Sequence, residues 1–145
     1  MLYAGTQKTL PLREWRKTAP ALWVRPLVEG EEVVGPHFSK PTIQYIGATS
    51  GCGCDFPHSL LNGGEWVSPE KEAEETSPEE QQTYRSNGQA LMNLLSDFGE
   101  DTYELYGFWA GNGAKAPLAV EDIPLQRIVE PDFRFCEQVF YRIHV

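Results

Sequence analysis

Two cysteines separated by a single glycine are the residues with the clearest chemistry in this chain. Cys52 and Cys54 lie in the run GCGCDFPH, which covers residues 51–58 and ends in His58. Thiolates and an imidazole bind thiophilic metals, and two neighbouring thiols can also exchange electrons as a dithiol. The spacing therefore predicts a thiol-centred site in this loop and leaves its chemistry open.

A metal site is the favoured interpretation of the loop. Cys52 and Cys54 would bind zinc or another thiophilic metal, with His58 supplying a nitrogen. A fourth ligand would come from Cys136, His37, His144 or Asp55. Structural zinc sites usually space their cysteines by two to four residues and contain a second pair, which this sequence lacks.

Dithiol redox chemistry is the first alternative. A disulfide between Cys52 and Cys54 would close a small ring, whose strain should favour the reduced form and make the pair an oxidant or a sensor. The reactive thiol would need a basic neighbour, and Asp55 would oppose its ionisation. The candidate basic neighbours are His37, Lys40 and His58.

Two further interpretations remain for the same loop. In one, Gly51 and Gly53 build a tight turn and the cysteines pack as small apolar residues, so that the protein is a non-catalytic interaction partner. In the other, a single nucleophilic cysteine pairs with His37 or His58 in a hydrolytic site, although no oxyanion hole or third orienting group can be identified. Whether the protein is an enzyme is therefore undecided at this point.

Charge and length exclude several classes of function. The chain has 145 residues, enough for one domain over 1–145, and a net charge of -9, which disfavours nucleic-acid and membrane-surface partners. Residues 1–6 have the pattern of a strand and not that of a basic, apolar secretory leader, and no apolar run is near the roughly 20 residues that span a bilayer, so we expect neither a secretory leader nor a transmembrane segment. Three cysteines, an odd number, favour reduced thiols in the cytoplasm. A protein partner is compatible with all of this.

The elements that must position the loop follow from the apolar pattern. Residues 42–48, just before the loop, predict a strand, and residues 21–28 predict a second one that Pro26 places at a sheet edge. Residues 1–6, 103–109 and 132–145 also have strand patterns; we expect the 103–109 strand to be central and the last strand to have one core face. Trp109 is expected in the core, with a pocket as the alternative.

One long helix completes the prediction. Residues 62–82 form an acidic connector, with six glutamates and one lysine between Glu70 and Glu80. It contains two Ser-Pro-Glu signals for helix starts, at Ser68 and Ser77. From Ser77, apolar residues at three- and four-residue spacing predict an amphipathic helix that ends at Gly99. Strands on both sides of one helix indicate an α+β fold, a mainly antiparallel sheet covered by that helix.

Taken together, these motifs resemble those of a group of small bacterial proteins of unassigned function. The resemblance runs along most of the chain, and its specific part is the Gly-Cys-Gly-Cys-x-Phe run at residues 51–56. Weaker shared elements are His37-Phe38-Ser39-Lys40-Pro41, Tyr45-Ile46-Gly47 and Leu105-Tyr106 with Trp109. The resemblance implies a bacterial cytoplasmic protein and assigns no role to either cysteine.

Overall fold

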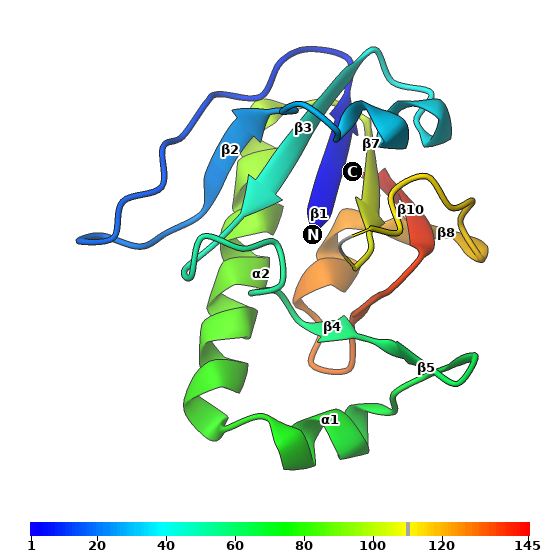
Figure 1. The fold of residues 1–145 in the computed structure, drawn as a ribbon. Helices are drawn as coiled ribbons and strands as arrows, with labels where there is room; N and C mark the ends of the chain where they lie inside the picture. Colours follow the sequence, from blue (N-terminus) through cyan, green and yellow to red (C-terminus); the bar gives the residue numbers. More distant parts are fainter. Residues whose placement is uncertain (110) are drawn as a thin grey trace.

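Six strands form one mixed sheet through the centre of the protein (Figure 1). The computed structural model describes residues 1–109 and 111–145. The spatial order is β2 (Trp23–Pro26), β3 (Thr42–Gly47), β1 (Leu2–Thr6), β7 (Thr102–Gly107), β10 (Val139–His144) and β8 (Ala119–Pro124). Every neighbouring pair is antiparallel except β8 with β10. The predicted α+β fold with a mainly antiparallel sheet is confirmed, as are the edge position of β2 and the central position of β7.

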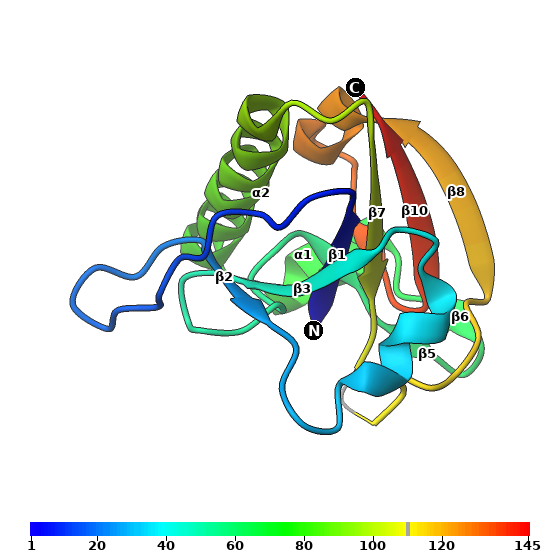
Figure 2. The ribbon, with the colours of Figure 1, turned by 90° about the horizontal axis from the view of Figure 1, so that it is seen from above.

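The long helix α2 (Pro78–Phe98) covers one face of this sheet (Figure 2). Its side chains Leu91, Leu94 and Leu95 are buried in one core cluster with the strand residues Ala4 and Leu105. The helix ends at Gly99 in the left-handed conformation, at φ 77°. Glycine adopts that conformation without the Cβ clash that other residues suffer, so the predicted end of the helix is confirmed.

A second core lies on the opposite face, under the short 3-10 helix η1 (Glu32–His37). It contains Val34 from η1 together with aromatic side chains of the sheet, namely Tyr3, Tyr45, Tyr106, Phe108 and Phe140. In the last strand Val139, Tyr141 and Ile143 form the predicted core face, and Arg142 and His144 on the other face are exposed. Phe140, at 4% exposure, is the exception, because the second core covers it. The second core was not predicted because η1, a six-residue segment containing Pro36, has no helical periodicity to reveal it.

The edge strand β8 is an element that the sequence pattern did not predict. Its central residues Val120, Glu121 and Asp122 are exposed, and only Ala119 and Ile123 pack against the core. A strand with so little buried surface lacks the alternation on which strand prediction depends. The 3-10 helix η2 (Leu125–Val129) follows it directly and packs against α2.

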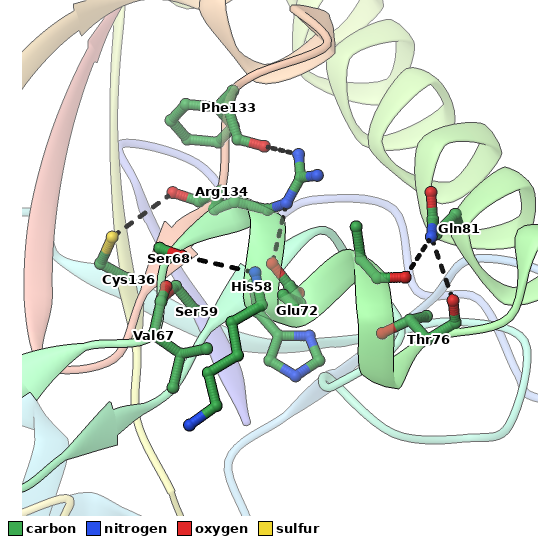
Figure 3. A network of polar contacts seen from close by, with 12 residues as sticks. His58, Ser59, Val67, Ser68, Glu72, Thr76, Gln81, Phe133, Arg134 and Cys136 are labelled. Carbon is green, nitrogen blue, oxygen red and sulfur yellow. Dashed lines mark hydrogen bonds and ion pairs between the residues drawn. The ribbon is translucent and has the colours of Figure 1, made fainter.

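The acidic connector folds as predicted into two successive helix starts. Ser68 caps α1 (Pro69–Glu75) and Ser77 caps α2, each accepting a hydrogen bond from a backbone N–H of the first turn. Arg134, close to the last strand, donates to the carboxylate of Glu72 over 3.0 Å and fastens α1 to the body of the protein (Figure 3). The connector is thus an anchored helix and not only a solvated chain.

Replacing Ser77 with alanine should lower the free energy of unfolding by about 1 kcal/mol. The change removes the acceptor for the Glu80 N–H and dismantles a capping box in which the Glu80 carboxylate accepts from the Ser77 N–H. Urea unfolding followed by circular dichroism measures the loss. Ser96→Ala, at an exposed position of the same helix, is the matched control and should change stability by less than about 0.5 kcal/mol.

Candidate thiol site

The Cys-Gly-Cys loop follows β3 directly and is held as a tight turn. The N–H of Gly51 donates to the carbonyl of Ala48 over 2.8 Å, and the N–H of Ala48 donates to the carbonyl of Cys52 over 3.1 Å. Gly51 has φ 82°, in the region that favours glycine. Trp15 lies against Gly51 and donates its indole N–H to the carbonyl of Thr49. The loop therefore has one fixed backbone path.

Gly53 fixes the loop against the sheet. Its N–H donates to the hydroxyl of Tyr45 over 2.8 Å, and a Cβ at this position would lie 2.4 Å from the backbone nitrogen of Leu2 and 2.9 Å from the carbonyl oxygen of Ile46. Only glycine permits this approach of the loop to β1 and β3. Burial raises the pKa of Tyr45 above its ordinary value.

The two sulfur atoms on either side of Gly53 form a close pair. The Cα atoms of Cys52 and Cys54 are 5.2 Å apart, a separation typical of disulfide-bonded cysteines. The backbone N–H of Cys54 donates to Sγ of Cys52 over 3.2 Å, whereas Sγ of Cys54 lies 4.0 Å from Oδ1 of Asp55. An N–H donor stabilises a thiolate and a carboxylate opposes one, so the two sulfurs are chemically unequal.

Asp55 joins the loop to the long helix. Its Oδ2 accepts from the N–H and hydroxyl of Ser50, and its backbone carbonyl accepts from the side-chain amide of Asn87 on α2 over 2.7 Å. Asp55 is 7% exposed and Asn87 is 8% exposed. Sequence reasoning considered Asp55 but missed Asn87 and Tyr45. A polar residue on the apolar side of a predicted helix was the available signal for Asn87.

His37, His144 and Lys40 lie apart from the sulfur pair, whereas His58 lines the same cavity as Cys54. Lys40 lies just before β3, whereas the cysteines follow it, and the six residues of this strand span about 17 Å. His37 lies in η1, with its ring against Tyr106. His37 contacts the carbonyl of Gly113, and Lys40 donates to the hydroxyl of Thr102. His144 pairs with Asp122 at the edge of the sheet.

His58 is closest in sequence to the pair, and its ring is held by local contacts. Nδ1 lies 2.9 Å from the carbonyl oxygen of Phe56, and the ring packs against Tyr84 of α2. Among the residues described, no group of three or more histidine, cysteine and acidic side chains is arranged to hold a metal ion. The arrangement thus brings together Cys52 and Cys54, with Asp55 beside them.

Cys136 comes near the loop but faces a different cavity. β4 (His58–Ser59) pairs in parallel with β9 (Phe135–Cys136), which places Cys136 opposite Ser59. Cys136 lines a cavity with Arg134 and Tyr141, and its thiol lies near the carbonyl oxygen of Arg134 (Figure 3). Burial raises the pKa of this thiol, which makes it a poor nucleophile at neutral pH.

A largely apolar cavity opens beside Cys54. Its lining includes Leu2, Phe56, Phe108, Phe135 and Leu60, in addition to Cys54. Trp109 stands at its rim and is 57% exposed, so the expectation that Trp109 belongs to the core is wrong and the pocket alternative describes it. Cys52 is not part of this lining. The cavity therefore gives the two cysteines different surroundings.

Comparison with known proteins adds no family to this description. The chain matches no family model, no curated protein and no solved structure. None of the helices described here is long and apolar enough to cross a membrane. The fold and the site therefore define the class, an α+β domain with a paired-cysteine loop beside an apolar cavity.

Proposed function

We propose that the protein carries out thiol–disulfide exchange at Cys52 and Cys54. The observation that supports this most is the close sulfur pair, held in a loop that is fixed by Tyr45 and Asn87. Exchange requires two sulfurs within bonding reach, one of them accessible to a partner and the other able to leave as a thiolate. Cys54, which lines the cavity, suits the first role, and Cys52, which accepts an N–H, suits the second.

The oxidising half-reaction starts from the disulfide form and consumes a dithiol substrate. A substrate thiolate attacks Sγ of Cys54, the bond between the two cysteine sulfurs breaks, and Cys52 leaves as a thiolate next to the Cys54 N–H. The second substrate thiolate then attacks the substrate sulfur of the mixed disulfide and releases Cys54. The substrate loses two electrons and two protons and forms a disulfide, and Cys52 and Cys54 end as thiols.

Equilibration with reduced and oxidised dithiothreitol tests the proposal. After acid quenching and alkylation, mass spectrometry should show Cys52 and Cys54 changing together, in one two-electron step, while Cys136 is unaffected. Cys52→Ser and Cys54→Ser should each abolish the transition, and Cys136→Ser should preserve it. Two cysteines that remain thiols in every buffer would contradict the proposal.

Zinc binding is distinguished by the same samples. If stoichiometric zinc copurified with protein lacking a metal-affinity tag, and if it protected both thiols from alkylation, a metal site at Cys52, Cys54 and His58 would replace the exchange proposal. His58→Ala would then release the metal, whereas it should leave the dithiol transition present if exchange is correct.

A further inference from the structure

We infer that the exchange partner is a polypeptide whose cysteine is flanked by an apolar side chain, which enters the cavity beside Cys54. This inference rests on the proposed function and names the substrate class for the same site.

The walls are suited to an apolar side chain. Leu2, Phe56, Phe108 and Phe135 form buried parts of the lining, each at most 5% exposed. Leu60 and Trp109 remain at the rim, 40% and 57% exposed, so both would lose water contact when a ligand covers them. Removing apolar surface of this kind from water favours binding.

The charges around the cavity disfavour small anionic thiols. No lysine or arginine is among the described residues that line it, and the lining contains His58, the acidic Glu137 and Met1, whose ammonium donates to the backbone carbonyl of Phe108. The buried carboxylate of Asp55 lies next to Cys54, and the whole chain carries a net charge of -9. Glutathione carries two carboxylates and one ammonium, so its net negative charge would approach against this field, and the Met1 ammonium is already bonded to the Phe108 carbonyl. An apolar segment of a polypeptide carries no such penalty.

Glu137 holds the rim in place before any ligand binds. One carboxylate oxygen accepts from the N–H of Trp109 over 3.3 Å, and the other accepts from the N–H of Leu61 over 3.0 Å. The backbone carbonyl of Glu137 also accepts from the indole of Trp66. These bonds join the segments that carry Leu60 and Trp109. The rim segments therefore lose little conformational entropy when a ligand binds.

The test compares the rates at which three single thiols open the disulfide form, the first step of exchange, in which a mixed disulfide forms with Cys54 and Cys52 leaves as a thiolate. The first is a peptide with leucine and phenylalanine around one cysteine, the second is the same peptide with serine and glutamate at those positions, and the third is glutathione. We expect the apolar peptide to react about tenfold faster than either of the others, since burial of one large apolar side chain corresponds to that factor.

Variants at the rim show whether the cavity is responsible. Leu60→Ser and Trp109→Ser should each reduce the ratio of the apolar-peptide rate to the glutathione rate, whereas Leu12→Ser, which removes an exposed leucine outside the cavity, should leave it unchanged. If the three thiols reacted at equal rates, the inference about the partner would be overturned. Exchange with dithiothreitol in the same protein would still support the proposed function. Failure to exchange even with dithiothreitol would instead refute the function itself.

Discussion

Gly53→Ala is expected to lower the free energy of unfolding by about 3 kcal/mol, the upper range for overpacking. The added Cβ would lie within 3.0 Å of backbone atoms of Met1, Leu2 and Ile46, and backbone in the middle of a sheet cannot move aside as a flexible side chain can. Relief requires the loop to lift from β1 and β3, which breaks the Gly53 to Tyr45 hydrogen bond. Urea unfolding monitored by tryptophan fluorescence measures the loss.

Gly35→Ala is the matched control for this prediction. Gly35 lies in η1, has no positive φ, and has no atom within 4 Å of the position that its Cβ would take. Its replacement should change stability by less than about 1 kcal/mol. Equal losses for the two variants would show that contact of the loop with the sheet is not what Gly53 provides. The Gly53 variant should also exchange more slowly with dithiothreitol, because the sulfur pair depends on the same contact.

Glu31→Gln is expected to lower stability at pH 7 by about 3 kcal/mol. Glu31 is 8% exposed and accepts hydrogen bonds from Arg25, from the N–H of Val28 and from the hydroxyl of Tyr3. Removing its charge leaves the Arg25 guanidinium without a counter-ion, although that guanidinium also lies 4.1 Å over the ring of Tyr45. Removing one partner of a largely buried ion pair lowers the free energy of unfolding by more than the intact pair contributes, because the other charge stays buried without a partner.

The pH dependence of this effect has a defined sign. Burial by itself would raise the pKa of Glu31, but the bonds from Arg25 and Val28 outweigh it, and the pKa is lowered in the folded protein. The pKa of a glutamate in the unfolded chain is about 4.3, and above that pH the ionised Glu31 stabilises the fold in full. This stabilisation is lost as the pH falls through the lower pKa that Glu31 has in the folded protein. The difference between wild type and Glu31→Gln should therefore be full at pH 7 and shrink below about pH 4. Glu29→Gln, at an exposed neighbouring position, should show no such trend.

The sequence predicted those elements that are determined by residues adjacent in the chain. Each of these features is set by residues within a few positions of one another: the helix caps at Ser68 and Ser77, the end of α2 at Gly99, and the strand before the loop. η1 and β8 could not be predicted in the same way. η1 is defined by the aromatic cluster that it covers, and β8 by its pairing with β10.

The candidate site shows the same division. The cysteine spacing located the loop, and Asp55 was already among the named residues. Tyr45, Asn87 and Phe135 were not predicted, because each reaches the loop only through sheet register or helix packing. His37 and Lys40 were misleading for the opposite reason. They are close to Cys52 in sequence, but β3 extends between Lys40 and the loop, and η1 places His37 against Tyr106 and Gly113.

The central position of β1 determines when the protein can complete its fold during synthesis. Residues 2–6 must pair with β3 on one side and with β7, about a hundred residues later, on the other. Contacts so distant in sequence make folding slow, because the entropy of closing a long loop is lost before strand pairing contributes favourable free energy. On the ribosome, Cys52 and Cys54 emerge well before β7 and β9, which supply the cavity walls. We therefore expect both thiols to meet small oxidants and reductants in the nascent chain long before the finished cleft can select a partner.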